Sequence, residues 1–124
     1  MRTIHNIIVS VFVKGDKQRH EAALHRLIPF DWEKEKVDVR VQQAEGHEGD
    51  VIEIYSIKLH AQRHTRSVFR VLAENIPAQD WGMVYDERRE RIGEDGALFI
   101  RLDREKLIDG RFRVMDGGDC FHIR

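Results

Sequence analysis

The chain has a single cysteine, Cys120, among its 124 residues, so it cannot form an intramolecular disulfide. Such a composition is typical of proteins from a reducing compartment, and we expect a cytoplasmic location. Long apolar runs are also missing, because none approaches the roughly 20 residues that a membrane-spanning helix needs. We therefore expect no membrane partner.

An excess of positive charge is missing as well. The sequence holds 21 Lys/Arg and 22 Asp/Glu, which gives a formal net charge of -1. A protein that binds nucleic acid through its overall charge is strongly basic, so an anionic partner of this chain must be held by local patches. Residues 54–79 offer one, with four Lys/Arg against one Asp/Glu, whereas residues 31–53 hold three against eight.

The hydrophobic content of 41% and the charged content of 35% are those of a soluble globular protein, and the length fits one domain over residues 1–124. Alternating apolar residues predict a strand over 4–14. Asp16 is placed to cap a following helix, whose apolar face ends before Pro29. The members of that face are His20, Ala23, Leu24, Leu27 and Ile28.

Val37, Val39 and Val41 then alternate with polar residues and predict a half-buried strand. In the next apolar stretch the phase slips between Ile54 and Ile57. A β-bulge near Tyr55–Ser56 would explain the slip, as would cover on both faces of the strand. The stretch "QQAEGHEGDVIEI" joins these two strands, and its glycines predict a hairpin turn.

The second half of the chain predicts a helix over 62–76, with an apolar stripe of Val68, Phe69, Leu72 and Ile76, and a short helix over 78–89. A hairpin turning at Asp95-Gly96 follows, then one helical turn in "DREKLIDG". A last hairpin is predicted to turn at Gly117-Gly118. Its inward residues, with those of the hairpin before it, are Leu98, Ile100, Leu102, Phe112, Val114, Phe121 and Ile123.

Short links between many strands favour a mainly antiparallel sheet with helices packed on one face, an α+β two-layer sandwich. The segments "IHNIIVSVFV", "HEAALHRLIP", "EGHEGDVIEIYSIKL", "RIGEDGALFIRLDREKL" and "GDCFHIR" occur in that order. The chain thereby resembles an archaeal family of predicted RNA-binding proteins, also described as predicted exosome subunits. The resemblance implies a fold similar to that of ribosomal protein L five, RNA as partner, exosome or ribosome-related proteins as further partners, and no established catalysis.

One departure from the family concerns the loop within "QQAEGHEGDVIEI". Many members have an Asn-Pro pair after the second loop glycine, where this chain has Asp50-Val51. The loop is therefore more acidic and less rigid than in the family, which weakens the case for a phosphate contact there. His47 at its tip is a candidate for a role in recognition, and a plain turn is the alternative.

Basic side chains of the second predicted helix are the main candidates for RNA binding. Arg63, Arg66 and Arg70 are spaced i, i+3 and i+7, so they share one side of the helix, and Lys58 extends the patch. Guanidinium groups one turn apart can follow a phosphate backbone through bidentate contacts. A solvated helix face is the alternative. A second group of candidates lies on the hairpins and comprises Arg101, Arg111 and Arg113.

The uncovered sheet face is the basis of a different hypothesis. If Phe12, Phe99 and Met115 lie there, the face is a partner surface, either for a second copy of the chain or for another protein. Phe99 beside an arginine could also stack on a base. A protein–protein adaptor that never touches RNA is thus the rival function.

Metal binding and catalysis have less support. His60 and His64, or Cys120 and His122, could supply two ligands each, but zinc sites usually show four in tighter patterns. We predict no metal site and no cofactor. The sequence has no phosphate-cradling Gly-rich loop or recognised acid/base pair, so we predict no catalytic residues. A metal-dependent enzyme that uses the acidic residues 31–53 is the remaining alternative.

Overall fold

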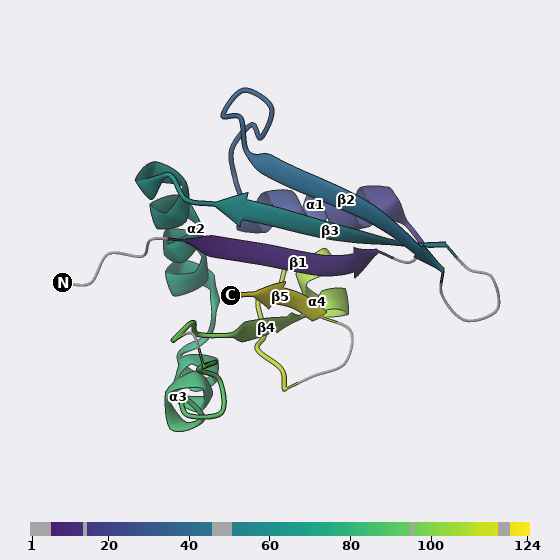
Figure 1. Ribbon diagram of the computed structural model, residues 1–124. Coiled ribbons are helices and arrows are strands. Elements are labelled where there is room, and N and C mark those ends of the chain that lie inside the picture. The colour runs from purple at the N-terminus through teal and green to yellow at the C-terminus, as the bar shows by residue number, and fades with distance from the viewer. Residues whose placement is uncertain (1–5, 14, 46–50, 95, 117–119) are drawn as a thin grey trace.

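The computed structural model describes residues 6–13, 15–45, 51–94, 96–116 and 120–124, the side chain of Val51 excepted. The strands are β1 (Ile7–Val13), β2 (Asp38–Glu45), β3 (Val51–Leu59), β4 (Ile100–Asp103) and β5 (Cys120–Ile123). The helices are α1 (Lys17–Leu27), α2 (Gln62–Asn75), α3 (Ala78–Asp86) and α4 (Arg104–Ile108). Figure 1 shows their arrangement.

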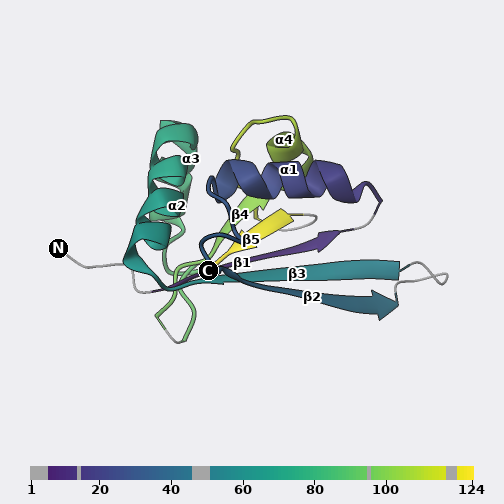
Figure 2. The ribbon, with the colours of Figure 1, turned by 90° about the horizontal axis from the view of Figure 1, so that it is seen from above.

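The strands form one sheet of order β2-β3-β1-β5-β4, in which every neighbouring pair is antiparallel. β1 is the central strand, and its side chains alternate between buried residues and half-buried or exposed ones, as in a sheet that is covered on one face. All four helices lie on one side of the sheet, which Figure 2 shows from above. The predicted α+β two-layer sandwich is therefore confirmed.

The core lies between the sheet and the helices. β1 contributes Ile7, Val9, Val11 and Val13, all buried. The predicted apolar face of α1 is buried in full, and Asp16 caps the helix by accepting a hydrogen bond from the Arg19 N–H at 3.2 Å. Most of the predicted inward residues of the C-terminal half are buried too. They are Ile100, Leu102, Phe112, Val114, Phe121 and Ile123.

β3 has no bulge at Tyr55–Ser56, so one of the two explanations for the phase slip is excluded. Its pairing with β1 runs without interruption from Glu53 to Leu59, and its pairing with β2 is equally regular. Tyr55 points inward on the same face as Ile57 and Leu59, and all three side chains are buried. Ile52 and Ile54 point to the other face, where they are half-buried. The phase slip therefore reflects partial cover of both faces, the other explanation offered by the sequence.

The last predicted hairpin is wrong. β5 pairs with β4, and Val114 forms a bridge to Leu102 on the opposite edge of β4. β4 therefore lies between the two segments that were expected to pair with each other. The predicted turn residues Gly117 and Gly118 lie outside the described residues. The other predicted hairpin is present, because residues 91–93 pair with 97–99. Of its predicted turn residues, Gly96 has a φ of 81° and Asp95 lies outside the described residues.

Two elements are more exposed than their sequence patterns indicate. β2 is an edge strand, and Val39 and Val41 are exposed although they point to the helix side. α3 ends at Asp86, and Tyr85 lies at its surface with the Arg88 guanidinium 4.2 Å from its ring centroid. None of the described helices combines the length and the apolar character that crossing a membrane requires.

Candidate nucleic-acid interface

The arginine side of α2 is exposed over its whole length. Val68 and Leu72 are buried against the sheet, and the helical spacing turns Arg63, Arg66 and Arg70 to solvent. The arginines are therefore separated from the buried members of the predicted stripe, but its member Phe69 is exposed, contrary to the prediction. Arg66 and Arg70 make no ion pair with a described residue, so their guanidinium groups can accept a new anionic partner.

Arg63 differs from the other two because a carboxylate already holds it. Its Nε donates to Glu35 Oε1 at 3.0 Å, and His64 Nε2 lies 3.2 Å from the same oxygen. The His64 ring is buried and stacks on Phe30 with centroids 4.6 Å apart. The hydrogen bonds from Arg63 and then His64 lower the pKa of Glu35 below its usual value. Glu35 therefore stays ionised and competes with any phosphate for Arg63.

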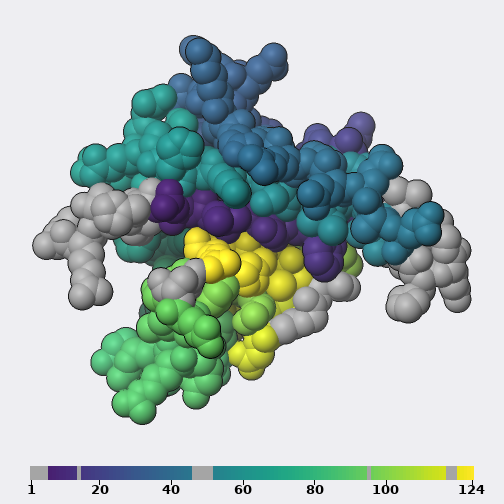
Figure 3. Space-filling model, viewed as in Figure 1, coloured from purple at the N-terminus to yellow at the C-terminus, as the bar shows by residue number. Residues whose placement is uncertain are grey.

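Lys58 points away from the helices, since its neighbours Ile57 and Leu59 are buried and strand residues alternate between faces. It lies exposed on the open sheet face, opposite Ile8 on β1 and Asp38 on β2. Figure 3 looks onto this face, where β1 crosses the middle between β3 and β5. Lys58 is thus near the end of the sheet from which the chain passes into α2.

Arg101 lies on the same open face at the other edge, opposite His122. Burial, and then the charge of Arg101, lower the pKa of His122, so the imidazole is neutral at pH 7. The Phe99 ring is 5.3 Å from the His122 ring, and the Arg124 guanidinium is 5.3 Å from the Phe99 centroid. Phe99 therefore lies among basic and aromatic groups at the sheet surface. Arg101 shares a small hollow with Glu87, Glu90, Asp116 and the buried Arg91, which already pairs with Glu87 at 2.8 Å and with Asp116 at 2.9 Å.

Arg113 is engaged by a buried carboxylate. Its Nε and Nη2 donate to Asp80 at 2.9 and 3.2 Å, and Asp80 also accepts the Val114 N–H at 2.9 Å. The hydrogen bonds from Arg113, with help from Val114, lower the pKa of Asp80 although burial opposes the shift. This cluster joins α3 to the segment beside β4, so Arg113 has a structural partner already.

The predicted basic patches do not form one surface. Arg111 is exposed after α4, 3.9 Å from Asp109, and α4 packs near α1 at a distance from α2 in both views. His47 lies outside the described residues. The structure adds an apolar cleft beside the α2 arginines, which the sequence did not predict as a site because Phe69 and Leu98 were expected inside the core. Among the described residues, no group of three His, Cys, Asp or Glu side chains could hold a metal ion.

Comparisons with known proteins agree with this architecture. RNA-binding protein PAB1135 of Pyrococcus abyssi is 26% identical over 122 residues, which cover 97% of this chain and 79% of that protein. AF2318 from Archaeglobus fulgidus has a TM-score of 0.80 at 25% identity, covering 96% of this chain and 83% of that chain. Mth689 from Methanothermobacter thermautotrophicus has a TM-score of 0.75 at 28% identity, covering 96% and 81%.

Both solved structures are described as DUF54 proteins. A family model described as RNA binding matches residues 6–124, which is nearly the whole chain. The resemblance seen in the sequence is therefore confirmed, and the chain belongs to this RNA-binding family.

Proposed function

We propose that this protein binds RNA without catalysis and that the exposed side of α2 holds the phosphates. The observation that carries the proposal is the pair Arg66 and Arg70, one turn apart, exposed and without an ion pair to a described residue. Membership of the RNA-binding family supports the ligand class. Lys58 lies on the open face of the sheet, whereas α2 lies on the helix side, so Lys58 is a separate candidate contact.

The other basic candidates contribute less in this proposal. Arg113 donates to Asp80, Arg101 has carboxylates around it, and Arg111 lies on a separate part of the surface. The family resemblance also makes exosome or ribosome-related proteins the partners to look for. That association is a separate proposal, because phosphate contacts by α2 do not depend on it.

The first test is the salt dependence of binding. We expect the native protein to bind a labelled RNA hairpin with an affinity on the order of micromolar at physiological salt. Three to four phosphate contacts should give a slope of about -3 in a plot of log affinity against log salt. Fluorescence anisotropy over a salt series measures both quantities, with a single-stranded RNA for comparison. A slope near zero would contradict a grip on phosphates.

A second candidate function uses the open sheet face as a contact with another copy of the chain. Phe12 is 62% exposed on that face near the end of the central strand β1, with Ile54 directly opposite on β3. Contact with a second copy would bury the Phe12 ring together with Ile54. Because α2 lies on the other side of the sheet, this contact is compatible with RNA binding.

We expect light scattering after size exclusion to show a dimer at high protein concentration and a monomer for Phe12→Ser. The substitution removes apolar surface from the contact and leaves the arginines of α2 in place, so RNA affinity per chain should be unchanged. The matched control is Val41→Ser, which removes an exposed apolar side chain from the helix side of the sheet. A native protein that stays monomeric would eliminate this candidate.

A further inference from the structure

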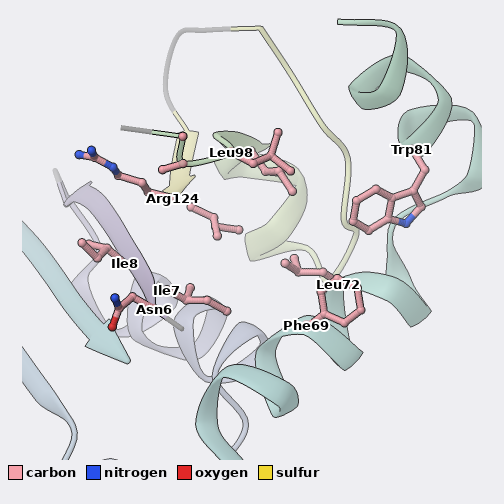
Figure 4. A pocket seen from close by; sticks show the side chains of 12 residues that line it. Asn6, Ile7, Ile8, Phe69, Leu72, Trp81, Leu98 and Arg124 are labelled. Carbon is pink, nitrogen blue, oxygen red and sulfur yellow. The ribbon is translucent and has the colours of Figure 1, made fainter. Parts of the chain in front are cut away.

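An apolar cleft of about 720 Å³ opens beside α2, at the end of the sheet where β1 begins. Phe69 and Leu72 of α2 and Trp81 of α3 form one side. Leu98 and Arg124 lie across the opening from Trp81, as Figure 4 shows. The volume is within the range of about 300–1,000 Å³ that small-molecule sites occupy.

Two of the apolar side chains that line the cleft are unusually exposed to solvent. Phe69 is 50% exposed and Leu98 is 40% exposed, although their sequence patterns place both with core residues. Keeping such surfaces in water is unfavourable, so a ligand that covers them gains free energy from their burial. A planar ring is a suitable ligand because Phe69 and Trp81 both offer aromatic surface to it.

The charges around the cleft indicate an anionic partner. Arg124 lines it directly, and Arg66 lies one turn before Phe69 on the same side of α2. Arg70, one turn beyond Arg66, continues the exposed side of the helix. Lys58 lies opposite Ile8, which is also a lining residue. No acidic side chain is among the lining residues that the structure describes. An apolar protein segment would gain little from these cations, whereas a nucleotide needs both features.

We propose that the cleft takes one unpaired nucleobase of the RNA, while Arg66, Arg70 and Arg124 hold the phosphates on either side of it. The proposal rests on the proposed RNA binding and names the feature of the RNA that is recognised. A base inside a duplex is covered on both faces by its neighbours, so only a bulged or single-stranded base can enter. Asn6, at the rim, can hydrogen-bond to a base edge.

The test compares two RNA duplexes that differ only in one bulged 2-aminopurine, whose fluorescence falls when it stacks on an aromatic ring. We expect the native protein to bind the bulged duplex about 10-fold more tightly than the fully paired one, with quenching of the bulged base. Phe69→Ala, which removes a half-exposed wall, should reduce that preference to below about 3-fold and leave the affinity for the paired duplex unchanged.

A second cleft variant and a control variant outside the cleft show whether the preference for the bulged duplex depends on the cleft. Leu98→Trp fills the mouth of the cleft and should also abolish the preference, whereas Val41→Ala truncates an equally exposed residue on β2 and should keep it. The proposal is overturned if the native protein shows no preference, or if the preference survives in both cleft variants. It is likewise overturned if these variants change only the oligomeric state, because the cleft then holds protein. If the native protein binds neither duplex, the proposed function itself is refuted.

Discussion

Replacing Arg66 and Arg70 together by glutamine is expected to weaken RNA binding on the order of 50-fold at about 0.1 M salt. Each phosphate contact contributes about 0.9 to the salt slope, and at that salt one contact is worth roughly 8-fold in affinity. The slope should therefore become shallower by about 1.8. Anisotropy titrations with one RNA hairpin, at four or more salt concentrations, measure both changes.

The matched control removes the same charge from other parts of the surface. Arg19 in the first turn of α1 and Arg89 after α3 are exposed, and neither has an ion pair with a described residue. Arg19→Gln/Arg89→Gln should weaken binding by less than about 3-fold, because only long-range attraction is lost. Equal losses in the two double variants would mean that net charge, and not the surface of α2, governs the affinity.

Arg63 is left out of that variant for a structural reason. Its bond to Glu35 ties α2 to the segment that follows α1, together with the buried His64. Removing Arg63 would therefore alter the surroundings of Glu35 as well as the RNA contact, and the two effects could not be separated. Arg66 and Arg70 have no such link to a described residue, so glutamine in their place tests the phosphate contact alone.

Local patterns were sufficient to predict much of the fold. The alternation in β1, the Asp16 cap of α1 and the end of α1 before Pro29 depend on neighbours within a few residues, and the structure agrees with each. β3 shows the limit of that reasoning. Its inward residue Tyr55 carries a hydroxyl, which bonds to Glu21 at 3.2 Å, and a pattern based on aliphatic residues misses it.

The candidate site was less predictable because its properties depend on residues far apart in the sequence. The spacing of the α2 arginines predicts that they share one side of the helix. However, Arg63 is already paired with Glu35, which lies 28 residues earlier in the sequence. The local pattern predicts an exposed strand arginine at Arg113. In the structure this side chain pairs with Asp80, which lies 33 residues away in the sequence. The cleft requires α2, α3 and the 91–99 hairpin together, and no one of these segments predicts it.

Asp80→Asn is expected to lower the free energy of unfolding by about 2 kcal/mol at pH 7. Asp80 is buried and accepts three hydrogen bonds, two from Arg113 and one from the Val114 N–H. Asparagine can accept from Val114, but it cannot pair with the guanidinium. The Arg113 side chain is 42% exposed, so water screens the pair and the loss is smaller than for a fully buried pair. Urea unfolding measures the difference.

The pH dependence of the same variant separates the ion pair from a packing defect. The pKa of Asp80 is lowered in the folded protein, chiefly by Arg113, so the unfolded chain takes up the proton first as the pH falls. The stabilisation is therefore complete above the unfolded pKa of about 3.9 and is lost as the pH falls through the folded value. The native protein and Asp80→Asn should converge in stability toward acid pH, whereas a packing defect would keep them apart at every pH. Asp109→Asn, which changes an exposed carboxylate 3.9 Å from Arg111, is the control and should stay within about 0.5 kcal/mol of the native protein.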